Sequence, residues 1–255
     1  MNGERATQRT VLIVTGADRI KFLQGMITND TDHLKNGLIY AALLTPQGKY
    51  LADFFVLEQK EGVLLDVDSA LAGGLLQRLN MYKLRADVRI KEASINVLRG
   101  TGPVPDGGHP DPRHVALGWR LYSELPGGEP IIDWDAIRVE HCIPQTGIEL
   151  TPNDTFPLEA GLERLSGVDF KKGCYVGQEV TARMKHKTEL RKGLATVLVQ
   201  GSAPVGTPIT ADGKAAGALF TQANGQGIAY LRFDRAKGDM KAGEALVILK
   251  KSPSA

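Results

Sequence analysis

The sequence predicts an α+β protein with a small C-terminal β-barrel, and three observations support this prediction. Strand–helix–strand patterns recur in the first 140 residues. After about residue 190 the pattern changes to short apolar strands separated by glycine and proline, which is typical of a small all-β barrel. The composition, with 42% hydrophobic and 24% charged residues, is that of an ordinary globular protein. We therefore expect α+β units over residues 1–190 and the barrel over residues 191–255.

Short apolar runs bounded by turn chemistry predict the individual strands. Before the barrel, the runs are residues 10–15, 38–45, 50–58, 63–67, 87–94, 95–99 and 115–122. In the barrel, they are residues 194–200, 207–213, 215–221, 227–233 and 244–250. Residues 46–49, Pro-Gln-Gly-Lys, have good β-turn chemistry, so the two flanking runs are expected to pair. Residues 100–113 are rich in glycine and proline without periodicity and are expected to form a loop.

Apolar residues at helical spacing predict four helices. One is expected after Asp18, one after Ser69 and one after Asp133, because these side chains can accept a hydrogen bond from the free N–H groups of a first helical turn. The fourth is expected over residues 177–187.

Cysteine usage and charge exclude several classes of protein. Cys142 and Cys174 are too few for a disulfide framework or a four-thiolate metal site, and the five histidines show no ligand spacing. Free thiols are typical of an intracellular protein, so we expect a cytoplasmic location. The N-terminal segment lacks the apolar stretch of a signal peptide, and no run reaches transmembrane length, so a membrane is not an expected partner. A net charge of +2 does not indicate a nucleic-acid binder.

The segment KKGCYVGQE, residues 171–179, carries the first candidate for chemistry. Cys174 lies shortly before the helix expected over residues 177–187 and close in sequence to Lys171 and Lys172. A helix N-terminus and nearby positive charge both favour the thiolate, which is the reactive form of cysteine. The alternative is that Cys174 packs in the core as a small hydrophobic residue, as most free cysteines do.

The same region is strongly basic. Residues 171–192 contain seven Lys/Arg and two Asp/Glu. One interpretation is an anion site for phosphate or carboxylates, and the alternative is a solvated helix face, which is the usual role of a charge run. Aromatic residues are scarce here, so stacking on single-stranded nucleic acid is poorly supported.

Three polar residues stand out in apolar surroundings. Asn29 follows an apolar helix, where it could simply end the helix or form a turn. Asp53 lies inside an apolar strand, where carboxylates are unusual unless the face is exposed or functional. Glu159 lies in the apolar loop FPLEAGLE, where it could pair with the donor nitrogens of a flat ring. For Asp53 and Glu159 the alternative is a solvent-facing side chain.

The string KGCYVGQE, with FPLEAGLERLSGVDF before it and TARMKHKTELRKGL after it, resembles the YgfZ family of folate-binding proteins that assist iron–sulfur enzymes. The likeness extends to FLQGMITND, LLTPQGKYLADFFV, LNMYKLRADV and RVEHCIPQTGIEL, and so spans most of residues 10–195. The family shares its fold with the T-protein of the glycine cleavage system, an aminomethyltransferase. The resemblance therefore implies two intertwined α+β units over residues 1–190, a C-terminal barrel and a central folate channel.

The resemblance also implies the residues of a site. Cys174 corresponds to the cysteine of the motif and is expected to act as the catalytic residue. Glu159 corresponds to the carboxylate that holds the pterin ring in the T-protein, and a carboxylate can accept two hydrogen bonds from that ring. The residues expected to contact tetrahydrofolate or a derivative are Glu159, Lys172, Gly173, Tyr175, Gly177, Gln178, Glu179, Arg183, Asn29 and Asp53. No residue is expected to bind a metal.

The expected function is that of a tetrahydrofolate-binding accessory protein for the assembly or maintenance of iron–sulfur clusters in client enzymes, tRNA-modifying enzymes among them. Its expected partners are folate and iron–sulfur client or assembly proteins. Where the T-protein has paired aspartates this chain has Ala52 and Asp53, which argues against glycine cleavage and leaves open whether the protein is an enzyme. The alternatives are a folate-dependent aminomethyltransferase and a tRNA-binding module that uses residues 171–192.

Overall fold

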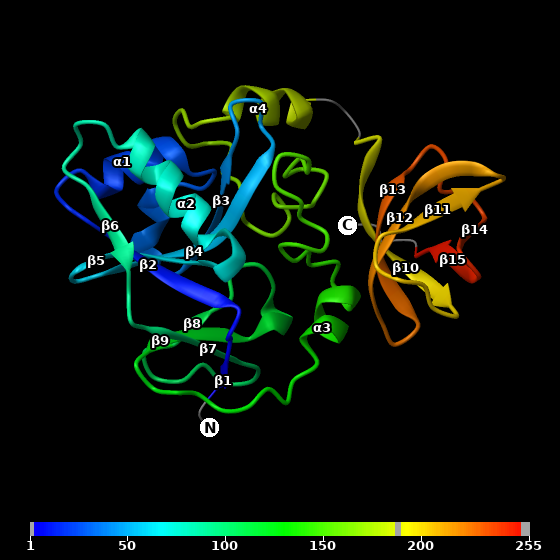
Figure 1. The fold of residues 1–255 in the computed structure, drawn as a ribbon, viewed down its shortest axis with the longest axis horizontal. Coiled ribbons are helices and arrows are strands. Elements are labelled where there is room, and N and C mark those ends of the chain that lie inside the picture. Colours follow the sequence, from blue (N-terminus) through cyan, green and yellow to red (C-terminus); the bar gives the residue numbers. More distant parts are fainter. Residues whose placement is uncertain (1–2, 187–189, 251–255) are drawn as a thin grey trace. The chain divides into compact units, whose positions relative to one another are not determined.

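The computed structural model describes residues 3–186 and 190–250, and the chain forms two compact units (Figure 1). The first unit comprises Met1–Ile132, Pro152–Asp154 and Leu162–Ala182, and the second comprises Asp133–Thr151, Thr155–Gly161 and Arg183–Ala255. The prediction divided the chain at residue 190. The structure instead groups α3 (Trp134–Glu140) with the barrel, because this helix packs against β12 (Lys214–Ala223) and β13 (Gln226–Arg232).

The first unit is built on an antiparallel sheet with the strand order β3-β4-β5-β2-β6. Its strands are β2 (Arg9–Thr15), β3 (Ile39–Leu44), β4 (Tyr50–Gln59), β5 (Gly62–Asp68) and β6 (Arg89–Glu92). The predicted turn joins β3 to β4: Thr45 N donates to Lys49 O at 2.8 Å, and Gly48 has a φ of 73°, which glycine adopts without strain. The predicted pairing of these two strands is confirmed.

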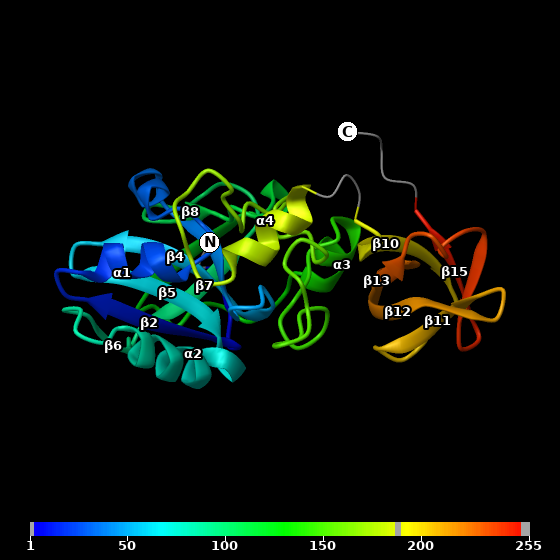
Figure 2. The ribbon, with the colours of Figure 1, turned by 90° about the horizontal axis from the view of Figure 1, so that it is seen from above.

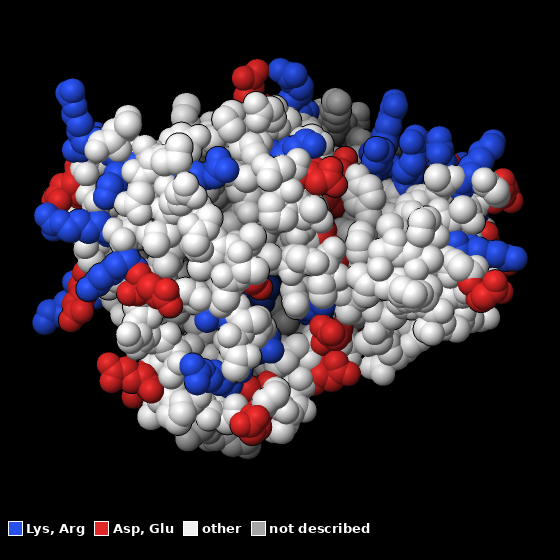
Figure 3. Space-filling view, in the orientation of Figure 1, with Lys and Arg blue, Asp and Glu red and all other residues white. Residues whose placement is uncertain are grey.

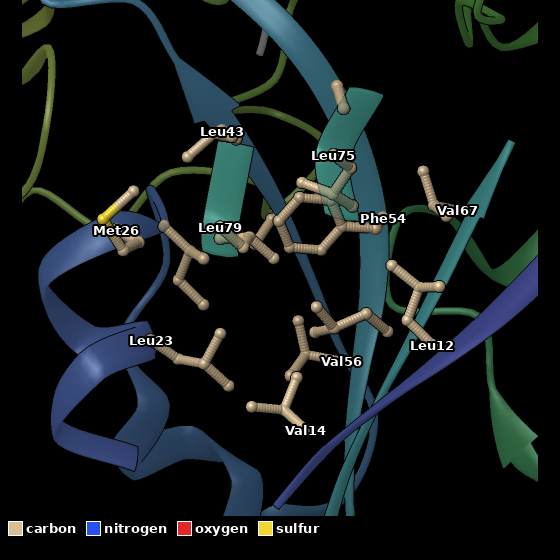
Figure 4. Packing of buried hydrophobic residues seen from close by; sticks show 14 of the residues in the cluster. Leu12, Val14, Leu23, Met26, Leu43, Phe54, Val56, Val67, Leu75 and Leu79 are labelled. Carbon is tan, nitrogen blue, oxygen red and sulfur yellow. The ribbon is translucent and has the colours of Figure 1, made fainter. Parts of the chain in front are cut away.

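Two helices cover one face of this sheet, α1 (Arg19–Met26) and α2 (Ser69–Tyr82). Side chains from one face of the sheet, such as Leu12 of β2 and Phe54 of β4, pack with Leu23 of α1 and Leu79 of α2 in one core (Figure 4). Burying an aliphatic or aromatic side chain contributes about 1.5–3 kcal/mol, so this core is a main support of the unit.

The predicted helix caps are only partly confirmed. Asp18 precedes α1, but its carboxylate makes no capping bond and instead accepts a hydrogen bond from Asp87 N at 2.8 Å. The cap of α2 is Asp68, and Ser69 is already the first helical residue. Asp133 caps α3 as predicted. In the folded chain the Asp18 carboxylate is thus used by a distant backbone donor, and Asp68 Oδ1 accepts from Ala70 N at 3.0 Å at the start of α2.

A second antiparallel sheet, in the order β1-β7-β9-β8, completes the first unit. Its strands are β1 (Glu4–Arg5), β7 (Asn96–Gly100), β8 (His109–Pro110) and β9 (Trp119–Ser123). The segment predicted to be a loop thus contains a short strand, because His109 and Pro110 pair with Arg120 and Trp119 of β9.

Buried ion pairs join the two sheets of the first unit. Asp66 of β5 accepts hydrogen bonds from Arg9 at 2.6 Å and from Arg120 at 2.8 Å. Asp111 accepts from Arg113 at 2.8 Å and from Arg120 at 3.1 Å. Burial alone would raise the pKa of Asp111, but the charge and hydrogen bonds of Arg113, followed by the charge of Arg120, hold that pKa below its usual range. We call these five residues the arginine–aspartate network.

The second unit contains a closed barrel with the strand order β10-β13-β12-β11-β14-β15 (Figures 1 and 2). Its remaining strands are β10 (Lys192–Gln200), β11 (Thr207–Ala211), β14 (Asp239–Ala242) and β15 (Ala245–Leu249). Aliphatic residues such as Val197, Leu219 and Leu231 fill its core. The predicted barrel is therefore confirmed. No helix in the described part of the chain is long and apolar enough to cross a membrane.

Candidate functional site

The cysteine of the predicted motif lies in an exposed loop, residues 169–176, which we call the thiol loop. Cys174 is exposed, whereas Lys172 and Tyr175 on either side of it are buried. The helix α4 (Gln178–His186) begins four positions after the cysteine, close to the predicted start. The interpretation of Cys174 as a packing residue is therefore wrong, because its side chain is displayed at the surface of the first unit.

The Lys172 ammonium anchors the thiol loop to the end of α1. Its Nζ donates to the backbone oxygens of Gln24 at 2.8 Å, Ile27 at 2.6 Å and Asn29 at 2.9 Å, and lies 5.0 Å from the centroid of the Tyr175 ring. Carbonyls at a helix C-terminus lack partners within the helix and carry the negative end of its dipole, so they suit a cation. Burial lowers the pKa of Lys172 to about 8, against the opposing effect of two nearby carboxylates.

Backbone hydrogen bonds hold the rest of the thiol loop to the same early part of the chain. Asp169 N donates to Thr28 O at 3.0 Å, and Val176 N donates to Gly25 O at 3.3 Å. The Asp169 carboxylate also lies 2.9 Å from His33 Nε2. The loop is thus held at both ends and in its middle, and Cys174 is presented from a fixed backbone.

Two residues predicted to contact folate act as internal anchors. Asn29 is buried, and its Nδ2 donates to Tyr40 O and to Ser166 O, each at 2.8 Å. Lys172 uses its ammonium on three backbone oxygens of the same unit. These hydrogen bonds do not support a folate contact by Asn29 or Lys172, and such a contact stays a prediction.

Glycines of the motif have separate physical explanations. Gly177 has a φ of 86°, and a Cβ at this position would lie 2.6 Å from Thr45 O, so the residue allows the start of α4 to approach the β3–β4 turn. Gly48 of that turn would place a Cβ 2.9 Å from Val180 Cβ. At Gly173, by contrast, a Cβ would meet nothing within 4 Å, so the space beside the backbone of residue 173 is open.

The remaining predicted contacts lie on α4: Gln178 and Glu179 in its first turn and Arg183 in its last turn. The basic segment 171–192 is only partly a surface feature. The charge of Lys172 is turned inward, and two further charged positions, Lys187 and Glu189, lie outside the described residues. An anion site that uses the full charge of this segment therefore stays a prediction.

Asp53 is a buried carboxylate that accepts hydrogen bonds from two phenols. Tyr40 Oη donates to Oδ2 at 3.0 Å, and Tyr50 Oη donates to Oδ1 at 2.7 Å. Burial, followed by the charge of Asp53, raises the pKa of Tyr40 well above its ordinary value, so this phenol stays a donor. Its neighbour Ala52 belongs to the apolar core under α1 and α2. The strand thus has one carboxylate at this place.

Glu159 belongs to the second unit, where the barrel holds it. Tyr230 Oη of β13 donates to Glu159 Oε2 at 2.6 Å, and Glu159 O accepts from Leu194 N of β10 at 2.8 Å. The side chain is half-buried rather than fully solvent-facing. The barrel therefore orients this carboxylate.

Four residues that position these groups were not among the site residues predicted from the sequence. They are Gln24, His33, Asp169 and Tyr230. Gln24 and Asp169 lie in segments that resemble the YgfZ family, which was the available signal. No spacing rule joins them, because their partners lie far away in the sequence.

The fold defines a structural class. The solved structure of the glycine cleavage system aminomethyltransferase T from Bartonella henselae matches with a TM-score of 0.77 over 98% of this chain and 84% of that chain, at 14% sequence identity. Residues 191–254 match the family described as the C-terminal beta-barrel domain of CAF17. The protein thus has an aminomethyltransferase-like fold with a C-terminal barrel, as predicted. At this identity the likeness concerns the fold alone.

Sequence relatives define the family. The mitochondrial iron–sulfur cluster assembly factor IBA57 of Mus musculus is 30% identical, over 92% of this chain and 79% of the relative, and that of Homo sapiens gives the same figures. The mitochondrial IBA57 homolog of Neurospora crassa is 32% identical, over 82% of this chain and 56% of the relative. The chain belongs to the IBA57 family, which is related to YgfZ; membership of YgfZ itself stays a prediction.

The predicted cytoplasmic location is contradicted by the same comparison. All three relatives are described as mitochondrial proteins. The prediction rested on free cysteines, which indicate a reducing environment but do not distinguish one reducing compartment from another.

Proposed function

We propose that this protein supports the assembly or maintenance of iron–sulfur clusters in client enzymes, and that the Cys174 thiol takes part directly. One observation carries the proposal: Cys174 is exposed on a loop whose backbone is held by the buried ammonium of Lys172. The family relatives, described as iron–sulfur cluster assembly factors, agree with this role.

The chemistry of the thiol loop supports this function. Reactive cysteines are partly exposed, whereas structural cysteines are buried and inert. A loop that is ordered before a partner arrives loses less conformational entropy on binding, so the partner meets the thiol in a set position. Tyr175 and Lys172 are buried beside Cys174, and they keep this backbone in place.

The test uses cells that lack the native protein. Variants Cys174→Ala and Cys174→Ser are expected to melt at the wild-type temperature, because the side chain is exposed, yet to leave iron–sulfur enzymes inactive. Cys142→Ala is the matched control and is expected to restore those enzymes. If Cys174→Ala restores them as well as wild type does, the proposal is wrong.

We further propose that the second unit contributes to binding tetrahydrofolate or a derivative through Glu159. Tyr230 occupies Oε2 of this carboxylate, and in the described part of the chain Oε1 accepts no hydrogen bond, which leaves an acceptor for ring N–H donors. Glu159→Ala is expected to weaken folate binding about ten- to a hundredfold in calorimetry, the effect of a lost charge-assisted pair. Glu140→Ala on α3 is the control, and equal affinities for both variants would exclude this role.

An accessory role is favoured over aminomethyl transfer by the strand that carries Asp53. Its carboxylate is held by Tyr40 and Tyr50, and the adjacent Ala52 offers no second acid. In a reconstituted glycine cleavage system we expect no turnover above background. A rate near that of an authentic T-protein would favour the aminomethyltransferase instead. Service to tRNA-modifying clients stays a prediction.

A further inference from the structure

The end of α2 displays apolar side chains to solvent. Leu84 is 86% exposed and Met81 is 68% exposed, and Tyr82 between them is exposed as well. Leu84 also has a φ of 45°, a left-handed conformation that is uncommon for a residue with a Cβ. Hydrogen bonds from Lys83 N to Leu79 O and from Ala86 N to Lys83 O hold this turn. The fold therefore keeps a strained, exposed leucine in place.

A pocket of about 350 Å³ opens beside this turn, at the start of α1. Its apolar wall consists of Phe22, Tyr82, Leu84 and Ala86. This volume is at the lower end of the range for ligand pockets, and an aromatic or branched aliphatic side chain fits within it. We call the pocket, together with Met81, the α1–α2 surface.

Positive charge surrounds the pocket. Its rim contains Lys21, Lys83 and Arg85, and the ion pairs seen nearby among the described residues, Arg19–Glu58 and Arg89–Asp87, involve none of these three. The acid at the rim, Asp18, uses Oδ2 to accept from Asp87 N. Figure 3 shows lysine and arginine side chains, with acidic side chains among them, projecting from the side of the molecule that carries α1 and β6. An occupant with negative charge would satisfy these cations.

The α1–α2 surface and the thiol loop share helix α1. Lys21 and Phe22, near its start, line the pocket, while Gln24 O and Gly25 O, near its end, hold Lys172 and Val176. A helix of eight residues is about 12 Å long, so a bound protein segment that extended from the pocket along α1 would reach the thiol loop within a few residues.

We propose that the α1–α2 surface binds an acidic segment of a partner protein, with one apolar side chain of that segment anchored in the pocket. A small anion would satisfy the cations but leave Leu84 and Met81 in water, whereas a protein segment covers both. Exposed apolar patches with a polar rim mark protein interaction sites. This inference rests on the proposed function, since it brings a cluster donor or client to Cys174.

The first test measures binding with a defined probe. The probe is a fluorescein-labelled peptide of about twelve residues with one phenylalanine among glutamates, and its matched control carries lysines instead. At low salt we expect fluorescence anisotropy to show that wild type binds the acidic peptide and not the control peptide. The acidic peptide should bind the double variant Lys83→Glu/Arg85→Glu at least tenfold more weakly than it binds wild type. Its affinity for wild type should also fall in high salt, because salt screens the charges. Absence of binding to wild type, or equal binding to the variant, would overturn the proposal. So would full displacement of the peptide by inorganic phosphate.

The second test separates the apolar anchor from folding. Leu84→Asn removes the apolar side chain, and asparagine tolerates the left-handed conformation, so this variant is expected to melt at or above the wild-type temperature. Val115→Asn, at a residue that is 88% exposed elsewhere in the unit, is the matched control. We expect Leu84→Asn to lose most of its support of iron–sulfur enzymes and the control to retain it, while both keep the wild-type alkylation rate at Cys174.

The outcomes distinguish this inference from the proposed function. If Cys174→Ala fails in cells but Leu84→Asn supports clients fully, the thiol proposal stands and the docking surface is wrong. If Cys174→Ala supports clients, the proposed function is wrong, and the peptide measurement still decides whether the surface binds acidic segments. If wild type forms dimers in sedimentation that Leu84→Asn abolishes, the occupant is a second copy, which overturns the proposal.

Discussion

Two places in the first unit bury positive charge, and they do so with different chemistry. In the arginine–aspartate network, Asp66 and Asp111 face the guanidinium groups of Arg9, Arg113 and Arg120. At the thiol loop, the buried ammonium of Lys172 donates its hydrogen bonds to three neutral backbone carbonyls, and the charges of Asp30 and Asp169 act on it without a direct ion pair among the described residues. Ion pairing holds the pKa of Asp111 low, whereas burial lowers the pKa of the Lys172 ammonium to about 8 because it outweighs the opposing charges of the two nearby carboxylates.

The difference shows which buried charge is structural and which is adjustable. A buried ion pair recovers its desolvation cost only while both partners stay in place, so the network resists change between its two sheets. An ammonium with a lowered pKa can lose its proton near neutral pH. Such groups gather at functional sites, and Lys172 lies two residues from the exposed thiol.

The largest effect is expected from breaking the network. Asp66→Asn keeps the size of the side chain but leaves Arg9 and Arg120 facing a neutral amide. We expect the free energy of unfolding in urea to fall by about 3–5 kcal/mol, the usual cost of removing one partner of a buried pair. A loss below about 1 kcal/mol would show that the network does not join the sheets as described.

Removing the ammonium at the thiol loop is expected to have a smaller, local effect. Lys172→Met leaves the oxygens of Gln24, Ile27 and Asn29 without their donor, at a cost of about 1–3 kcal/mol. Hydrogen exchange in the thiol loop should quicken, and Cys174 should react faster with an alkylating agent. The control is Lys171→Met, at the neighbouring exposed position. If hydrogen exchange in the thiol loop is as fast in this control as in Lys172→Met, Lys172 does not anchor the loop.

The pH dependence of unfolding sharpens the comparison. The pKa of Lys172 is about 8 in the folded chain and near 10.5 in the unfolded chain, so between these values the unfolded state binds more protons. Stability contributed by this group therefore rises with pH across that window, by about 1–3 kcal/mol. The difference in the free energy of unfolding between wild type and Lys172→Met should therefore grow in favour of wild type from pH 7 to 10. A difference that stays constant with pH would mean that burial does not lower the pKa.

The smallest effect on the free energy of unfolding is expected from an exposed ion pair between α1 and β4. Arg19 and Glu58 approach to 3.8 Å, but both side chains are solvent-accessible. Glu58→Ala should change the free energy of unfolding by less than about 1 kcal/mol, because exposed pairs gain little in high dielectric. If Glu58→Ala lowers the free energy of unfolding as much as Asp66→Asn does, burial does not explain why the two ion pairs differ in strength.

Local chemistry made much of this fold predictable. The barrel strands, the β3–β4 turn and α4 follow from alternation, turn residues and helical spacing, which act within a few positions of one another. The cap of α2 shows the limit: Ser69 and Asp68 are both good caps, and one residue of register decided between them. The prediction of a loop over residues 100–113 was wrong in part for a similar reason, because pairing with the distant strand β9 creates the short strand β8 there.

The sequence by itself determined the barrel, the apolar strands and the prominence of the motif around Cys174, because each rests on residues that are neighbours in the chain. Only the tertiary structure decided that Cys174 faces outward, that Lys172 faces inward, and that Tyr230 orients Glu159. Those outcomes depend on partners far away in sequence. The physical reason is that burial and hydrogen bonding are properties of groups brought together by folding, and no local pattern records which distant groups will meet.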